Sequence, residues 1–262
     1  MAATAIAFDN VCKSFDAGRV KAVDSVSLAI PQGQFLGIVG GSGSGKTTLL
    51  RLANRLIEAN SGTIRIDGKD IKQSDPIELR RQVGYVFQSA GLFPHMSIAE
   101  NVGITPRLLG MADAKIAARV DELLTLVRLD GAKYRRRFPH ELSGGERQRI
   151  GVARALAAEP KIVLMDEPFG ALDPLTRDGL GEDYRALHDK LGLTTIMITH
   201  DMTEAMLLAD RIGVMRTGQL IATGTAIELA ASEQAYVGEL MSTPRRQTAK
   251  LNALLADAGA RR

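Results

Sequence analysis

The sequence predicts an α/β fold that combines a mainly parallel sheet, an N-terminal antiparallel β subdomain and an inserted helical subdomain. Three short runs, 34–40, 161–168 and 194–201, are apolar for most of their length, as is typical of parallel strands buried on both faces. Before them, residues 5–30 alternate with a period of about two, which favours half-buried antiparallel strands. The stretch from about 91 to 140 is helical in character, so we expect it to interrupt the α/β core.

The N-terminal part is predicted to consist of strands separated by turns, with one helix after a glycine-rich loop. The sequence PQG at 31–33 marks a turn into the apolar strand that leads to this loop, and the helix is expected over 46–57. The other strands predicted in this part are 5–15, 20–30, 62–68 and 82–88.

The rest of the chain is predicted to be helical on either side of the core strands. A helix capped by Asp113 has one apolar face, formed by Ile116, Val120, Leu123, Leu124 and Val127. Residues 211–224 indicate a hairpin that turns near Thr217 and Gly218. Beyond it we expect a helical tail over 225–262, with a break near Ser242–Pro244.

Composition excludes several classes of protein. The chain has 262 residues, 45% hydrophobic and 24% charged, which are ordinary values for a soluble globular protein. A net charge of +3, no Trp and 4% aromatic residues argue against a nucleic-acid partner. Cys12 is the one cysteine, so no intrachain disulfide forms and a reducing compartment fits. We expect a cytoplasmic chain, because the sequence shows no signal peptide and no apolar run long enough to cross a bilayer.

A phosphate-binding motif lies between the first apolar strand and the helix after it. Residues 40–47, GGSGSGKT, match G-x-x-x-x-G-K-[ST], in which glycines let backbone N–H groups converge on phosphate oxygens. Lys46 should reach the β- and γ-phosphates of ATP, and the Thr47 hydroxyl should ligate Mg²⁺. A chance match is expected about once in a hundred chains of this length. The predicted nucleotide-binding residues are Gly40, Gly41, Ser42, Gly43, Ser44, Gly45, Lys46, Thr47 and Thr48.

This motif predicts a P-loop NTPase core, and it allows the acidic pair at 166–167 to be interpreted. Asp166 follows a run of apolar strand residues, so its carboxylate should emerge where such sheets bind ligands and hold Mg²⁺. Glu167 is then the candidate general base for the attacking water. The alternative, an acidic strand boundary without a role, is improbable beside a phosphate loop.

Two further polar residues follow strands of the same core. His200 could anchor the γ-phosphate and the attacking water, although a lone histidine at a strand end is more often a surface residue. Gln88 could be a ligand of Mg²⁺ or of water, and a polar side chain that merely ends a strand is an equally good interpretation.

A second glycine-rich loop, LSGGERQR at 142–149, contains no lysine. Ser143 and Glu146 fit the capping box S-x-x-E, so the loop starts a helix that runs to about Glu159. A cap does not require glycines at 144 and 145, whereas an anion at a helix N-terminus does benefit from them. We interpret the loop as half of a phosphate site, completed by a twofold-related copy of the chain.

These residues together resemble the ATP-binding-cassette (ABC) ATPases, over nearly the whole chain. In that family GGSGSGKTT is similar to the Walker A loop, Gln88 to the Q-loop, LSGGE to the signature, IVLMDE to Walker B and His200 to the switch histidine. The resemblance implies that Phe15 stacks on adenine, unless it is a core residue, and that Asp173 of the D-loop couples two sites. It also implies a nucleotide-binding domain over 1–224, with the helical subdomain at about 91–140.

The segments EPFGALDP and LFPHMSIAENV resemble the bacterial importer branch, and STPRRQ with LLADRIGVM resembles its quaternary-amine uptake members. This resemblance implies integral membrane permease subunits as partners, an extracytoplasmic solute-binding protein acting indirectly, and a peripheral position at the cytoplasmic face of the inner membrane. Three alternatives stay open: an importer of another solute such as an amino acid, sulfonate or polyamine; a non-transport ATPase of the family; and a nucleotide sensor that does not hydrolyse.

Overall fold

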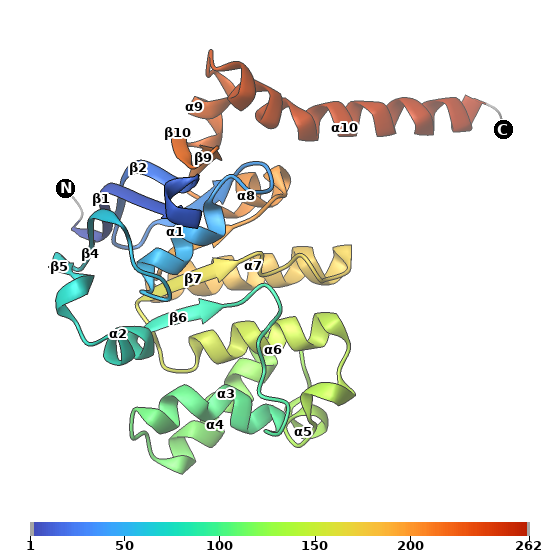
Figure 1. The fold of residues 1–262 in the computed structure, drawn as a ribbon. Helices are drawn as coiled ribbons and strands as arrows, with labels where there is room; N and C mark the ends of the chain where they lie inside the picture. The colour runs from blue at the N-terminus through green and yellow to red at the C-terminus, as the bar shows by residue number, and fades with distance from the viewer. Residues whose placement is uncertain (1–2, 261–262) are drawn as a thin grey trace.

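The computed structural model describes residues 3–260, which form two sheets surrounded by helices (Figure 1). The strands are β1 (Thr4–Phe15), β2 (Val20–Pro31), β3 (Phe35–Val39), β4 (Ser61–Ile66), β5 (Lys69–Asp70), β6 (Val83–Val86), β7 (Ile162–Asp166), β8 (Thr194–Ile198), β9 (Arg211–Arg216) and β10 (Gln219–Gly224). The helices are α1 (Lys46–Ala53), α2 (Pro76–Gln82), α3 (Ile98–Leu108), α4 (Asp113–Leu126), α5 (Gly131–Tyr134), α6 (Gly144–Leu156), α7 (Pro174–Leu191), α8 (Met202–Leu208), α9 (Ala226–Ala230) and α10 (Ala235–Ala260). Short 3-10 turns are η1 (Asp16–Gly18), η2 (Ile71–Gln73) and η3 (Pro139–Glu141).

The larger sheet has the strand order β10-β9-β3-β8-β7-β6, and only β10 runs antiparallel to its neighbour. This confirms the mainly parallel core. Successive side chains of a strand point to opposite faces, and both faces of β7 are buried. Ile162 and Leu164 join the apolar cluster that contains α1, while Val163 and Met165 join the cluster that contains α6 and α7.

The smaller sheet, β2-β1-β4-β5, is antiparallel, as the alternating N-terminal sequence predicts. Its inward residues, including Ile6 and Ile30, are fully buried with α1 and one face of the larger sheet. In the larger sheet the parallel strands β3, β8, β7 and β6 have their carboxyl ends at one edge. The end of β1 and the start of β2 lie close to the loop that follows β3.

Helices α3, α4 and α5 lie together at the end of the molecule farthest from α10 (Figure 1). The apolar face predicted for α4 is buried, with Val120, Leu123 and Leu124 no more than 2% exposed. The predicted cap is wrong. Ala112 is the N-cap, Asp113 is the first residue of the helix, and no side chain makes a capping hydrogen bond at this helix start. In that position the Asp113 carboxylate still lies in the first turn, where the helix dipole favours negative charge.

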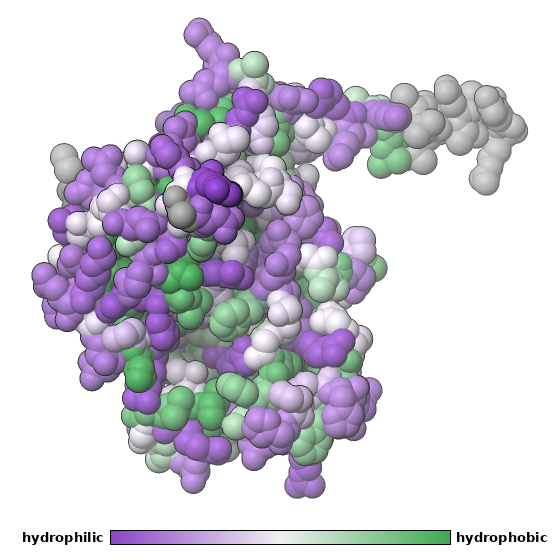
Figure 2. Space-filling model, viewed as in Figure 1, coloured by the Kyte–Doolittle hydropathy of each residue, from purple (hydrophilic) through white to green (hydrophobic). Residues whose placement is uncertain are grey.

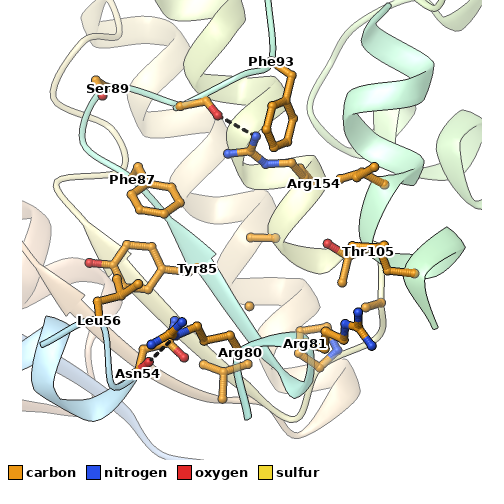
Figure 3. A pocket seen from close by; sticks show the side chains of 18 residues that line it. Asn54, Leu56, Arg80, Arg81, Tyr85, Phe87, Ser89, Phe93, Thr105 and Arg154 are labelled. Carbon is orange, nitrogen blue, oxygen red and sulfur yellow. Dashed lines mark hydrogen bonds between the residues drawn. The ribbon is translucent and has the colours of Figure 1, made fainter. Parts of the chain in front are cut away.

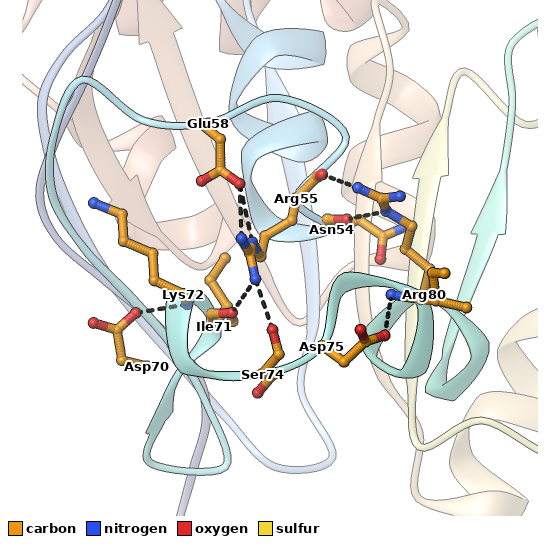
Figure 4. A network of polar contacts seen from close by, with 10 residues as sticks. Asn54, Arg55, Glu58, Asp70, Ile71, Lys72, Ser74, Asp75 and Arg80 are labelled. Atoms are coloured by element: carbon orange, nitrogen blue, oxygen red, sulfur yellow. Dashed lines mark hydrogen bonds and ion pairs between the residues drawn. The ribbon is translucent and has the colours of Figure 1, made fainter.

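Helix α1 ends at Ala53, although the sequence favoured a helix to residue 57. Arg55 has a left-handed φ of 46°, which stops the helix, and its side chain reaches η2. Its guanidinium donates to the carbonyls of Ile71 at 2.9 Å and Ser74 at 2.7 Å (Figure 4). The same group pairs with Glu58 at 2.9 Å. These long-range bonds outweigh the local helix propensity of the segment.

The tail contains α9 and α10; the start of α10 packs on the body, and the rest of the helix projects away from it (Figure 1). The predicted break near Ser242–Pro244 is wrong, because α10 continues through Pro244. Pro244 removes one backbone donor, while the Ser242 and Thr243 hydroxyls bond to the Glu239 carbonyl and tie this turn together. Residues 261 and 262 of the expected tail lie outside the described residues. Across residues 3–260, no helix combines the length and the apolar character needed to cross a bilayer.

Candidate nucleotide site and a neighbouring groove

A cavity of about 660 Å³ lies over the loop that joins β3 to α1. It is lined by loops from the carboxyl ends of adjacent parallel strands, and by the end of β1 and the start of β2. Ligands of open α/β sheets bind at this edge. The predicted site residues that line it are Phe15, Ser42, Gly43, Ser44, Gly45, Lys46, Thr47, Thr48, Gln88, Glu167 and His200.

The glycines of the loop are required by its backbone path. Gly40 has φ 151°, and a Cβ there would collide with the Met215 carbonyl oxygen of β9. Gly45, the N-cap of α1, has φ 101°, and a Cβ would collide with the Ala22 carbonyl oxygen. The loop is thus pressed between β9 and β2, and the positive end of the α1 dipole points at the cavity.

Lys46 is the buried cation of the site, with 7% of its surface exposed. Its Nζ donates to the carbonyls of Gly40 at 2.8 Å and Gly41 at 2.9 Å. Burial lowers the pKa of Lys46, and the carboxylates of Glu167 and Asp166 act in the opposite direction. A phosphate would provide the counter-charge that this buried ammonium lacks within the loop.

Thr47 and Asp166 bring two oxygens together beneath the cavity. The Thr47 hydroxyl donates to Asp166 Oδ1 at 2.9 Å, and Asp166 is 3% exposed. Burial raises the pKa of Asp166, while the bond from Thr47 lowers it. A hydroxyl and a carboxylate are hard oxygen ligands of the kind Mg²⁺ uses beside phosphates, so the pair fits that ion.

Glu167 forms the centre of a polar group at the open side of the cavity. Its Oε2 accepts from Gln88 Nε2 at 3.0 Å and lies 3.4 Å from His200 Nδ1. The residue has φ 48°, and its amide donates to the Ile198 carbonyl of β8 at 2.9 Å. A carboxylate held in this way above a phosphate loop can accept a proton from water.

Gln88 lies two residues beyond the end of its strand, because β6 pairs with β7 only through Val86. The predicted strand end at Gln88 is therefore too late by two residues. In this structure the Gln88 side chain faces Glu167 rather than the Thr47–Asp166 pair. His200 is exposed toward the cavity and follows β8.

Phe15 lies at the cavity rim, 43% exposed, at the end of β1. It is therefore not a core residue, which removes the main alternative to base stacking. The ammonium of Lys13 lies 5.2 Å from the centroid of its ring.

The second glycine-rich loop lies apart from this cavity within the described part of the chain. Ser143 Oγ accepts from the Glu146 amide at 3.2 Å, and Glu146 Oε2 accepts from the Ser143 amide at 2.7 Å, which is the predicted capping box. The Tyr134 hydroxyl and this cap lower the pKa of Glu146. Outside its own turn, a Cβ at Gly144 would meet no atom of the described residues within 4 Å, and one at Gly145 would lie 3.3 Å from the Leu172 side chain. Ser143, Gly144 and Gly145 are thus not brought to the phosphate loop by this chain.

Asp173, the D-loop residue, is the N-cap of α7. Its carboxylate accepts from the Thr176 amide at 3.0 Å, and hydrogen bonds from the Thr176 side chain and backbone hold its pKa below the usual range. It does not line the cavity, and its expected coupling role concerns a second copy of the chain.

The sequence-based prediction missed the contacts that the β9–β10 turn and the start of α10 make with the site. Thr217, at the β9–β10 turn, lines the cavity, and the neighbouring Gly218 amide donates to the Ser44 carbonyl at 3.0 Å. The Gly41 amide donates to the Tyr236 hydroxyl of α10 at 3.1 Å. The hairpin was predicted, but only the parallel pairing of β9 with β3 brings it to the loop.

A separate groove of about 430 Å³ lies between α2, β6, the loop after Val86 and α3 (Figure 3). Phe87 and Phe93 are 40% and 42% exposed on it, and Arg154 donates to the Ala90 and Gly91 carbonyls behind them. Asn54 Oδ1 and the Tyr85 hydroxyl are buried there, and neither has a hydrogen-bond partner among the described residues. Figure 2 shows apolar residues on this face, around the junction of the lower helices with the body.

The fold and the cavity define a P-loop nucleotide-binding protein with a helical insertion and a second glycine-rich loop. The sequence profile described as ABC transporter matches residues 23–170, and the chain belongs to this family.

Known proteins of this family resemble the chain over most of its length. The glycine betaine/carnitine/choline transport ATP-binding protein OpuCA of Bacillus subtilis is 52% identical over 221 residues, which are 84% of this chain and 58% of that protein. The sulfate/thiosulfate import ATP-binding protein CysA of Thermosynechococcus vestitus is 47% identical over 224 residues, which are 86% of this chain and 65% of that protein. The chain thus spans less than two thirds of either relative.

A solved structure agrees in fold as well as in sequence. The dimeric post-hydrolysis state of the ATP-binding cassette MJ0796 bound to ADP and Pi matches with a TM-score of 0.79 and 32% identity. The match covers 84% of this chain and 98% of that one, which confirms the α/β cassette fold with its antiparallel subdomain and helices.

Proposed function

We propose that this chain is the ATP-hydrolysing subunit of a bacterial ABC importer for a quaternary-amine osmoprotectant such as glycine betaine, choline or proline. One observation carries the ATPase part of this proposal. Glu167 is held by Gln88 and lies beside His200, directly over the loop that contains Lys46. A binding module that only senses nucleotide would not need a positioned base.

The residues divide the chemistry among them. Lys46 and the backbone amides of Ser42–Thr48 bind the β- and γ-phosphates, and Phe15 stacks on the adenine. Thr47 and Asp166 hold Mg²⁺, which neutralises phosphate charge in such sites. Glu167 accepts the proton of the attacking water, while Gln88 and His200 orient that water and the γ-phosphate. A role for Gln88 as a direct Mg²⁺ ligand belongs to the same proposal.

Hydrolysis is proposed to require a twofold dimer of this chain. MJ0796 has been solved as a dimer with ADP and Pi bound, and the match with it covers 84% of this chain. Among the described residues, nothing beyond its own turn would meet a Cβ at Gly144, and its φ is not positive, so neither packing nor backbone conformation there accounts for a glycine. Ser143, Gly144 and Gly145 would close the partner's phosphate loop, and Asp173 would link the two sites.

The other partners follow from the transport assignment. The groove lined by Phe87, Phe93 and Arg154 is proposed to receive a cytoplasmic segment of a membrane permease subunit. The chain would then lie at the cytoplasmic face of the inner membrane, and an extracytoplasmic solute-binding protein would act on it only through the permease.

The solute assignment has one specific competitor. The glycine betaine/carnitine/choline relative is 52% identical, and the sulfate/thiosulfate relative is 47% identical. In this proposal the site binds ATP and no solute, so the same site geometry serves either solute. Uptake of sulfate is therefore the second candidate function.

Uptake by cells tests the proposal. The chain and its membrane subunits are expressed in cells that lack their own osmoprotectant uptake, and labelled glycine betaine, choline and sulfate are supplied at low and high osmolarity. We expect betaine or choline uptake that Lys46→Ala abolishes and that Lys190→Ala, an exposed lysine on α7, leaves unchanged. If only sulfate is taken up, sulfate replaces the quaternary amine as the proposed solute. If Lys46→Ala leaves uptake unchanged, the ATPase assignment is overturned.

A further inference from the structure

The C-terminal tail makes direct contact with the phosphate loop. The backbone amide of Gly41, the second residue of GGSGSGKT, donates to the Tyr236 hydroxyl at 3.1 Å. Tyr236 lies in the first turn of α10, 195 residues farther along the chain. Neither the glycine motif nor the resemblance to ABC ATPases assigns a role to this tyrosine.

The ring of Tyr236 makes a second contact with the wall of the site. The Arg216 guanidinium lies 4.7 Å from the ring centroid, within the range of a cation–π interaction. Arg216 ends β9, and the turn that follows it brings Thr217 to the cavity and the Gly218 amide to the Ser44 carbonyl. Tyr236 therefore touches the phosphate loop directly and touches its neighbouring hairpin through Arg216.

The start of α10 is anchored well enough to hold this side chain in place. Val237 and Met241 are 0% and 4% exposed, in an apolar cluster with α8, α9 and β9. The position of the hydroxyl is thus set by buried packing of the helix rather than by the loop it touches.

The hydrogen bond has a geometric consequence for Lys46. The Gly41 N–H belongs to the same planar peptide unit as the Gly40 carbonyl, and that carbonyl accepts from Lys46 Nζ at 2.8 Å. In a trans peptide the N–H and C=O point in opposite directions, so fixing one end fixes the other. Tyr236 and Lys46 therefore hold the two ends of the Gly40–Gly41 peptide unit. Both of its residues are glycines, whose dihedral angles are otherwise unusually free.

We propose that Tyr236 is a positioning residue for ATP binding, through which α10 sets the orientation of the Gly40–Gly41 peptide and hence of Lys46. The inference rests on the proposed function of the cavity as an ATP site. The hydroxyl acts before nucleotide arrives, because it reduces the conformations that the glycine loop must give up on binding. By linkage, bound ATP also stabilises the contact between the tail and the body.

Tyr236→Phe tests the proposal, since it removes the hydroxyl and keeps the ring over which Arg216 lies. A net hydrogen bond changes an equilibrium by about 2- to 10-fold, so we expect the Kd and KM for ATP to rise by that factor. We expect kcat at saturating ATP to change less than about 2-fold, because the variant binds the same phosphates once the loop is ordered. Amide exchange at Gly41 in the nucleotide-free protein should quicken by a similar factor.

Gln234→Ala is the matched control. It removes a hydrogen bond of similar length between the tail and the body, from the Gln234 side chain to the Ile221 carbonyl of β10 at 3.2 Å, which does not reach the phosphate loop. We expect its ATP affinity and Gly41 exchange to equal those of the wild type. Equal ATP affinity of Tyr236→Phe and wild type would overturn the inference while leaving the proposed function intact. Equal weakening by Gln234→Ala would also overturn it, because loose docking of the tail would then be the cause. A wild-type chain that binds no ATP would overturn the proposed function itself.

Discussion

Substituting Glu167 by Gln should separate ATP binding from ATP hydrolysis. Gln is close to Glu in shape, and its amide oxygen can still accept from Gln88 Nε2, which lies 3.0 Å from Glu167 Oε2. The φ of 48° is as strained for Gln as for Glu, so the backbone gains no new cost. The substitution therefore removes the negative charge and the basicity of the side chain while leaving the neighbouring contacts in place.

The expected size of the effect follows from this change. Loss of a general base lowers a rate by about 10²- to 10⁴-fold, which corresponds to about 3–5 kcal/mol in the barrier. ATP binding should persist, because Lys46, Thr47 and the loop amides are untouched. The free energy of unfolding should change by less than about 1 kcal/mol, because no buried hydrogen-bond partner is lost. An ATP-bound dimer should then accumulate, since the nucleotide that closes it is no longer cleaved.

Phosphate release at saturating ATP measures the rate, and light scattering with and without ATP measures the dimer. Glu233→Gln, an exposed glutamate before α10, makes the same chemical change away from the cavity and should behave as wild type. A Glu167→Gln variant that hydrolyses ATP at the normal rate would refute the assignment of the base. A variant that binds ATP and stays monomeric would refute the shared-site dimer.

Three further predictions concern other residues. Lys46→Ala should abolish hydrolysis and weaken ATP binding, because the buried ammonium next to the Gly40 carbonyl is lost; turnover near that of the wild type would contradict the phosphate assignment. Ser143→Arg should inactivate hydrolysis while leaving binding of a fluorescent ATP analogue unchanged, whereas normal hydrolysis would reduce this loop to a helix cap. Burial lowers the pKa of His188 below its usual 6.5, so the unfolded chain binds more protons than the folded one in this pH range. The free energy of unfolding should therefore fall as the pH drops from about 7 to about 5. Denaturant titrations at both pH values should show a shallower dependence for His188→Gln than for the exposed control His95→Gln.

The parts of the site that the sequence predicts are those encoded by a local pattern at a strand end. Lys46, Glu167 and His200 each follow a buried run, and parallel pairing then brings the ends of β3, β7 and β8 to one edge. The end of α1 was missed because it depends on Arg55 bonding to carbonyls 16 and 19 residues away. The contact of Tyr236 with Gly41 spans 195 residues and has no periodic signal in the sequence. Long-range polar contacts of single side chains are therefore the main part of this molecule that pattern analysis cannot supply.

Gly144 of the second loop is the reason to propose a partner at a helix start that is already well capped within its own chain. Ser143 and Glu146 already complete the capping box, so the start of α6 needs nothing more for its own stability. Gly145 packs close to Leu172, because a Cβ there would be 3.3 Å from the end of that side chain, which would have to shift slightly. Gly144 has no positive φ, and a Cβ there would have no close neighbour in the described part of the chain beyond its own turn. We therefore base on Gly144 the proposal that an anion held by a second copy of the chain approaches the positive end of α6.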